Sequence, residues 1–245
     1  MITSNQNNKV KEWKKLHTKK GRMKAKSFMI EGFHLIEEAY RTNQEVKEMI
    51  IQEGVENPGW LQEEHVHFVS AQVFKEISQT EAPQGIAAVI KMQETVSTQD
   101  GPVLLIDAVQ DPGNLGTMIR TADAAGFSKV ILGRGTVDLY NDKVIRSTQG
   151  SLFHISIKQG HLLEVIPQLR AEGYRIWGTT LKRARNYAEL DAQPKTALIV
   201  GNEGAGVSDD VIELADDLVK IPIYGKAESL NVAIAAAILM YHIRL

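Results

Sequence analysis

Two polar segments in the second half of the chain carry side chains suited to binding a ligand or to chemistry. The first, 107–123, contains Asn114 and Arg120. The second, 201–208, reads GNEGAGVS and places Glu203 among three glycines, which let a backbone fold closely around a ligand. Both follow predicted strands, and open α/β sheets bind their ligands at the carboxyl ends of strands.

A third segment, 221–231, carries Ser229 and Asn231 where the chain passes from a predicted strand into an apolar helix. Ser229 could be only the N-cap of that helix. An amide such as Asn231, in a segment headed for burial, needs hydrogen-bond partners or lowers stability. We expect the three segments to converge into one cleft. The simpler interpretation of Arg120 is an ion pair with Asp123 on the same helix.

Signatures of other catalytic sites are missing from the sequence. There is no cysteine, which removes disulfides, thiol nucleophiles and thiolate metal sites. The patterns GxGxxG of dinucleotide-binding proteins, GxxxxGK[ST] of P-loops and GxSxG of hydrolases do not occur. His65 and His67 have no third ligand at metal-binding spacing, so we interpret them as polar residues of an edge strand and predict no metal.

The second half of the chain has the pattern of a parallel sheet covered by helices on both faces. Its strands are continuous apolar runs separated by helical segments. The strands that we expect are 103–106, 130–132, 154–157, 174–178, 197–200 and 218–221. The last helix, 229–241, is apolar nearly all round and rich in alanine. We therefore expect it to be buried on several sides, close to another element or to a second subunit.

The first half predicts a smaller α/β unit behind a basic segment. The helices that we expect lie near 32–42 and 71–79, and the strands at 46–51, 67–69 and 85–91. A polar, turn-rich stretch before Pro102 has the composition of a linker. The division that we predict is a basic segment, a small α/β domain, a linker and a larger α/β domain, over residues 1–28, 29–93, 94–101 and 102–245.

The basic segment holds nine Lys and Arg residues against one acid, Glu12, although the whole chain has a formal charge of −2. Such a segment suits a polyanion such as nucleic acid, and the alternative is a solvated tail. Trp13, Leu16 and Phe28 favour a segment that packs onto the protein. The residues that we assign to nucleic-acid binding are Lys9, Lys11, Lys14, Lys15, Lys19, Lys20, Arg22, Lys24 and Lys26.

No apolar run approaches the ~20 residues that a membrane-spanning helix needs. The N-terminus also lacks the apolar stretch of a secretory signal. Hydrophobic residues make up 43% of the chain, which is ample for a packed core. We therefore expect a cytoplasmic protein without a membrane partner.

The three segments, taken in order and spacing, resemble the motifs of one enzyme family. NLGTMIR, GNEGAGVS and IPIYGKAESLNVA are similar to the three motifs of the SpoU/TrmH family of SPOUT RNA 2′-O-ribose methyltransferases. This resemblance covers roughly residues 103–245. The basic start followed by FMIEGFHLIEEA resembles the ribosomal-protein-like, RNA-binding α/β domain of rRNA-modifying members. One departure is Ala233, where many members have serine.

The resemblance implies a fold that strand patterns do not predict, a parallel sheet whose C-terminal segment threads a loop to form a trefoil knot. It implies S-adenosylmethionine as methyl donor. It also implies a homodimer through the C-terminal domain, with the last helix in the knot core and the subunit interface. The cofactor-binding residues that it implies are Thr179, Thr180, Gly201, Glu203, Gly204, Ile221, Ser229 and Leu230.

By the same family pattern, Arg120 is catalytic and Asn114 shapes the site beside it. Ser229 and Asn231 hold nucleotide or motif geometry, and Glu203 organises the loops through hydrogen bonds. Two roles for Arg120 stay open. It accepts the proton of the ribose hydroxyl, for which a guanidinium is poorly suited because it holds its own proton strongly, or it stays charged and stabilises the developing alkoxide and the adjacent phosphate.

The implied function is S-adenosylmethionine-dependent 2′-O-methylation of a ribose in RNA. We favour 23S rRNA over tRNA because of the added RNA-binding domain. The alternatives are a tRNA ribose methyltransferase and a catalytically silent RNA-binding or ribosome-assembly factor. The intact motif residues argue against the silent factor, and a nicotinamide-dependent dehydrogenase would need the missing glycine fingerprint.

Overall fold

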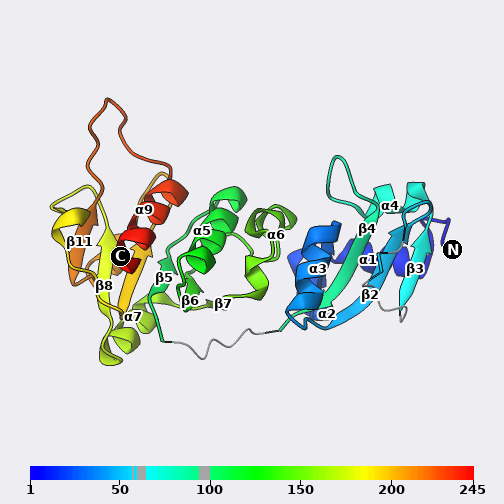
Figure 1. The fold of residues 1–245 in the computed structure, drawn as a ribbon, viewed down its shortest axis with the longest axis horizontal. Coiled ribbons are helices and arrows are strands. Elements are labelled where there is room, and N and C mark those ends of the chain that lie inside the picture. Colours follow the sequence, from blue (N-terminus) through cyan, green and yellow to red (C-terminus); the bar gives the residue numbers. More distant parts are fainter. Residues whose placement is uncertain (57, 60–64, 94–99) are drawn as a thin grey trace. The chain divides into compact units, whose positions relative to one another are not determined.

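The computed structural model describes residues 1–56, 58–59, 65–93 and 100–245. The chain divides into two compact units, each with its own sheet (Figure 1). The first unit comprises Met1–Gln93 and Tyr140–Phe153, and the second comprises Glu94–Leu139 and His154–Leu245. Most of the predicted linker, 94–101, lies outside the described residues.

The first unit contains a four-stranded sheet in the order β1-β4-β2-β3. Its strands are β1 (Ser27–Glu31), β2 (Val46–Gln52), β3 (Val66–Val69) and β4 (Ile86–Lys91). Its helices are α1 (Asn8–Lys15), α2 (Lys19–Ala25), α3 (Phe33–Arg41), α4 (Ala71–Ile77) and α6 (Asp142–Thr148), followed by the 3₁₀ turn Ser151–Phe153. The strands and helices expected in 32–91 are all present, and β1, α1 and α2 are additional elements.

The basic N-terminal segment folds into helices and is not a solvated tail. The side chain of Asn7 caps α1, and that of Thr18 caps α2. Val10, Trp13 and Leu16 are buried in one hydrophobic core with residues of α4 and of the sheet. The prediction that this segment packs onto the protein is therefore confirmed.

Glu48, on β2, ties α1 to the sheet. Its carboxylate accepts hydrogen bonds from Lys9 Nζ at 3.0 Å and from Trp13 Nε1 at 3.1 Å. It also lies 3.1 Å from Nε2 of His67, on the edge strand β3. His67 is thus a polar residue of an edge strand, as its spacing suggested.

Residues 140–153 pack within the first unit, although they separate two strands of the other sheet in the sequence. The ring of Phe28, on β1, lies 4.6 Å from the ring of Tyr140 and 6.5 Å from that of Phe153. His34 Nε2 is 3.2 Å from the carbonyl oxygen of Gln149. These contacts join α6 and the 3₁₀ turn to the first sheet.

The second unit contains a seven-stranded sheet in the order β7-β6-β5-β10-β8-β11-β9, and every strand pair is parallel. Its strands are β5 (Val103–Ile106), β6 (Lys129–Leu132), β7 (Ser156–Gln159), β8 (Arg175–Thr179), β9 (Arg185–Asn186), β10 (Thr196–Val200) and β11 (Asp217–Lys220). Its helices are α5 (Pro112–Ala124), α7 (Leu162–Ala171), α8 (Asp209–Ile212) and α9 (Val232–Arg244), with the 3₁₀ turn Tyr187–Glu189. The predicted parallel sheet is confirmed.

Helices cover both faces of this sheet. The α5 and α9 helices lie side by side on one face, and α7 lies on the other (Figure 1). Residues of α7 share a hydrophobic core with alternate residues of β5 and β10, with Ile176 of β8 and with Val211 of α8. Burial on both faces explains why these strands are continuous apolar runs.

Two elements of the second unit are displaced by two or more residues from the expected ranges. The strand expected at 154–157 begins at Ser156, because His154 follows the 3₁₀ turn and its Nδ1 contacts Asp123 at 3.1 Å. The last helix begins at Val232 and not at Ser229, because Asn231 is its N-cap. Asparagine suits this position because its side-chain oxygen accepts the free N–H groups of the first turn.

The composition of α9 predicted burial on several sides, but within this single chain only one side of the helix is buried. One side, with Ala236 and Met240, is buried. On another side, Ile234 and Tyr241 remain 52% and 50% exposed. The α9 helix therefore has more apolar side chains than its contacts within one chain bury.

Among the residues that the structure describes, no helix is long and apolar enough to cross a bilayer, and no group of three or more histidine and carboxylate side chains could hold a metal ion.

Candidate active site

The loops that carry the three motifs leave the same edge of the second sheet. The segment 107–114 follows β5, the glycine-rich loop 201–208 follows β10, and the segment 221–231 follows β11. In the sheet, β5 pairs with β10, β10 with β8, and β8 with β11. Since the strands are parallel, their carboxyl ends lie along one edge.

The glycine-rich loop closes on itself through Asn202. The backbone N–H and C=O of Asn202 both bond to Gly206, each at 2.9 Å, while its side-chain oxygen accepts the N–H of Gly204 at 2.9 Å. Its side-chain nitrogen donates to the carbonyl of Ala108 at 2.9 Å. At Gly201 the returning backbone is so close that a Cβ atom would lie 2.1 Å from it, so only glycine fits there.

Asp107 makes a second link between the first two segments. One oxygen of this buried carboxylate accepts hydrogen bonds from both the backbone N–H and the hydroxyl of Ser208, each at 2.8 Å. Asp107 and Asn202 are not among the candidate residues that the sequence analysis names. An acid directly after a buried strand and an amide beside a glycine cluster were the available signals.

Glu203 binds the N-terminal end of α5. Its carboxylate accepts hydrogen bonds from the backbone N–H of Gln110 at 3.2 Å, from that of Asp111 at 3.0 Å, and from the Asn114 side chain at 3.0 Å. Partial burial of the carboxyl opposes its ionisation, but the hydrogen bonds from Asn114 and the backbone outweigh it and lower the pKa of Glu203. The group is thus held as a carboxylate that joins two loops.

Asn114 continues this link to the third segment. Its side-chain oxygen accepts a hydrogen bond from Nδ2 of Asn231 at 2.9 Å. The side-chain oxygen of Asn231 in turn accepts the N–H groups of Ala233 and Ile234 at the start of α9. Glu203, Asn114 and Asn231 therefore form one hydrogen-bonded chain between segments that lie up to 117 residues apart in the sequence.

Arg120 lies on α5, six residues after Asn114, and its side chain is exposed. Six residues advance about 9 Å along a helix. The simple ion pair with Asp123 is not formed, since Asp123 contacts His154. Within the described ranges, the guanidinium of Arg120 has no hydrogen-bond or ion-pair partner. The structure therefore does not place Arg120 in the hydrogen-bonded chain.

The remaining residues assigned to the cofactor lie on the same edge. Thr179 ends β8 and Thr180 follows it, and the Thr179 hydroxyl donates to the carbonyl of Ile199 at 2.9 Å. Ser229 is exposed, and Leu230 is 37% exposed. Between 222 and 230 the backbone makes no hydrogen bond to another described residue, so its polar groups are free to meet a ligand.

The basic residues of the first unit fall into two groups. Lys9 and Lys14 pair with Glu48 and Glu76, and the buried Arg22 donates to backbone carbonyls at 2.8 Å and 3.0 Å. These three side chains hold the helices in place. The exposed residues without an ion-pair partner in the described part of the chain are Lys11, Lys15, Lys19, Lys20, Lys24 and Lys26.

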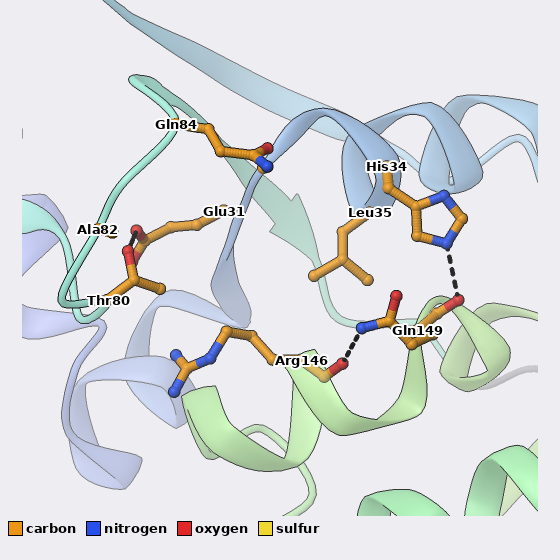
Figure 2. A pocket seen from close by; sticks show the side chains of 9 residues that line it. Glu31, His34, Leu35, Thr80, Ala82, Gln84, Arg146 and Gln149 are labelled. Carbon is orange, nitrogen blue, oxygen red and sulfur yellow. Dashed lines mark hydrogen bonds between the residues drawn. The ribbon is translucent and has the colours of Figure 1, made fainter.

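A pocket of about 270 Å³ lies in the first unit, between the start of α3 and α6 (Figure 2). Arg146 and Gln149 line it on the α6 side. Glu31 faces it from β1, with its carboxylate occupied by hydrogen bonds from Ser78, Gln79 and Thr80. None of the residues that the sequence assigned to a site lines this pocket.

Comparison with known proteins agrees with this architecture. The SpoU rRNA Methylase family model matches residues 101–241, and a model of the MRM3-like substrate binding domain matches 7–88. The chain is 50% identical over 244 residues to the 23S rRNA (guanosine(2553)-2′-O)-methyltransferase RlmP of Bacillus subtilis (strain 168), which covers 99% of this chain and 98% of the relative.

Solved structures of similar proteins contain the methyl donor. The AdoMet-bound rRNA methyltransferase from Sinorhizobium meliloti superimposes with a TM-score of 0.88 at 32% identity, covering 99% of this chain and 96% of that one. The SpoU methyltransferase AviRb from Streptomyces viridochromogenes, in complex with AdoMet, superimposes with a TM-score of 0.86 at 27% identity, covering 98% and 97%.

The parallel sheet with three hydrogen-bonded loops at one edge, together with the two matching family models, places the chain in the class of RNA methyltransferases. The chain belongs to the SpoU rRNA methylase family. The predicted family and the predicted kind of enzyme are therefore confirmed.

Proposed function

We propose that this protein transfers a methyl group from S-adenosylmethionine to the 2′-oxygen of a ribose in 23S rRNA. The observation that carries the proposal is the hydrogen-bonded chain Glu203–Asn114–Asn231, which joins the three motif loops into one site. The similar RlmP protein, which matches the chain over nearly its full length, is named for this reaction on 23S rRNA. The matched substrate-binding domain favours rRNA over tRNA.

The cofactor site lies between the loops after β8, β10 and β11. The unpaired backbone of 222–230 and the close turn at Gly201 fit a bent ligand that is held largely by main-chain groups. The residues that would hold it are Thr179, Thr180, Gly201, Glu203, Gly204, Ile221, Ser229 and Leu230. When bound, S-adenosylmethionine supplies an electrophilic methyl group on its sulfonium.

The chain's own residues position the ribose and stabilise charge. Asn114 has both ends of its amide fixed, by Glu203 and by Asn231, so the start of α5 is rigid beside the transfer site. The proton of the 2′-hydroxyl passes to solvent, while the Arg120 guanidinium stabilises the 2′-alkoxide that forms and binds the adjacent phosphate. We favour this role over proton acceptance because the exposed guanidinium of Arg120 has no hydrogen-bond or ion-pair partner among the residues that the structure describes.

The C-terminal segment threads a loop to form a trefoil knot. In support, β11 pairs with β8 and β9, whereas α9 packs on β10 and α5. The chain between 221 and 231 must therefore pass back across β8. The exposed apolar side chains of α9, Ile234 and Tyr241, are the interface of a homodimer.

The first unit binds rRNA through the exposed lysines of α1, α2 and the turn after them. Its helices hold these side chains on a folded surface, so less conformational entropy is lost on binding than from a disordered tail. Phosphate contacts of this kind give affinity and orientation, and not sequence preference.

Arg120→Ala tests the catalytic assignment. We expect calorimetric binding of S-adenosylmethionine to remain close to wild type, while transfer of radiolabelled methyl to 23S rRNA falls at least ~100-fold. Turnover at the wild-type rate would refute the role of Arg120. If the wild-type protein itself shows no heat with millimolar S-adenosylmethionine, the chain is a silent RNA-binding factor instead.

A further inference from the structure

A basic turn, 180–185, leaves the same edge of the sheet as the motif loops. It follows β8, which lies between β10 and β11. The hydroxyl of Thr179 donates to the Ile199 carbonyl of β10 at 2.9 Å, and the N–H of Thr180 donates to the Val219 carbonyl of β11 at 3.1 Å. The base of the turn is thus anchored to both neighbouring strands, beside the loops of the candidate active site.

The turn presents unbalanced positive charge. Lys182 and Arg183 are exposed, and neither side chain has an ion pair or hydrogen bond to another residue that the structure describes. Arg185 donates to the backbone carbonyl of Glu189 at 2.9 Å. The sequence contains no acidic residue between Glu172 and Glu189, although the second unit as a whole has more acidic than basic residues.

Arg183 adopts a backbone conformation that its side chain does not favour. Its φ is +52°, in the left-handed region where glycine is accommodated best. Glycine at position 183 would relieve the strain, so the stability of the folded protein does not explain why this residue is arginine. Unfavourable backbone conformations of this kind cluster at ligand-binding sites, where the side chain is needed.

We propose that Lys182 and Arg183 bind the phosphate backbone of the rRNA next to the ribose that is methylated. A guanidinium contacts two phosphate oxygens at once, and the lysine adds a second positive charge. Together they attract the polyanion to an edge of a unit that is otherwise acidic. The inference rests on the proposed function, because it takes this edge of the sheet as the place of methyl transfer.

Arg183→Gly and Lys182→Gln separate binding from stability. We expect Arg183→Gly to unfold at a temperature equal to or above that of wild type, because the strain is removed. In both variants the Kd for transcribed 23S rRNA should rise about two- to fivefold. The slope of log Kd against log salt should fall by about 0.7 for each charge removed. Calorimetric affinity for S-adenosylmethionine should not change.

Lys158→Gln is the matched control. Lys158 is exposed and has no ion-pair or hydrogen-bond partner among the described residues. It lies on β7, the edge strand at the end of the sheet away from β8, β11 and β9. Its removal changes the net charge equally and should leave the rRNA affinity unchanged. The proposal is overturned if Arg183→Gly and Lys182→Gln bind rRNA as wild type does, or if Lys158→Gln loses as much affinity. A wild-type protein that does not methylate rRNA would instead contradict the proposed function.

Discussion

At Gly201 the glycine-rich loop passes so close to its own returning backbone that a methyl group does not fit. We expect Gly201→Ala to destabilise the protein by about 1–3 kcal/mol, since neighbouring backbone must move. Gly204→Ala is the matched control, because an added Cβ there meets only the Asn202 side chain, at 3.7 Å. Urea unfolding measures both, and equal stability of the two variants would contradict the tight turn.

The Glu203 carboxylate makes the stability of the loops depend on pH. Its hydrogen bonds lower its pKa in the folded protein below the unfolded value of about 4.3. Its contribution is therefore complete above that value and is lost as the pH falls through the lower folded pKa. We expect wild type to be more stable than Glu203→Gln at pH 7, and the difference to shrink below pH ~4. A constant difference across that range, measured by urea unfolding, would argue against an ionised Glu203.

Asn114, Glu203 and Asn231 could be predicted from the sequence because each lies within a short, contiguous motif. Asp107 and Asn202 were missed because their partners, Ser208 and the Ala108 carbonyl, lie about a hundred residues away in the chain. Spacing could not give their geometry, which depends on which strands are neighbours in the sheet.

At the scale of elements, Glu48 decides how firmly α1 is held. We expect Glu48→Gln to destabilise the first unit by about 1–2 kcal/mol, because it weakens contacts to Lys9, Trp13 and His67. Glu12→Gln is the control, since its exposed carboxylate lies 3.7 Å from Lys9 and contributes little. Thermal unfolding distinguishes the two; similar midpoints would show that Glu48 does not anchor α1.

The strands of the second sheet were predictable because burial on both faces leaves a continuous apolar run. The first two helices were not, since only isolated apolar residues such as Val10 and Trp13 mark their buried face among many charges. The length of α9 was predicted, but its start was wrong by three residues because two side chains, Ser229 and Asn231, were both suitable caps.

At the scale of the whole molecule, the exposed apolar side of α9 predicts the oligomeric state. We expect wild type to sediment as a dimer, and Ile234→Lys to sediment as a monomer, because a charge at the interface would lose its hydration. Lys158→Gln, on β7, should remain dimeric. A dimer of undiminished stability in Ile234→Lys, measured by analytical ultracentrifugation, would place the interface elsewhere.

The assignment of Tyr140–Phe153 to the first unit means that one cut cannot divide this protein into two complete pieces. A fragment ending at residue 93 would leave the Phe28 ring without Tyr140 and Phe153. The remaining fragment would carry α6 and the 3₁₀ turn without the core against which they pack. Truncated forms should therefore aggregate, and the two halves should persist only when they are synthesised as one polypeptide.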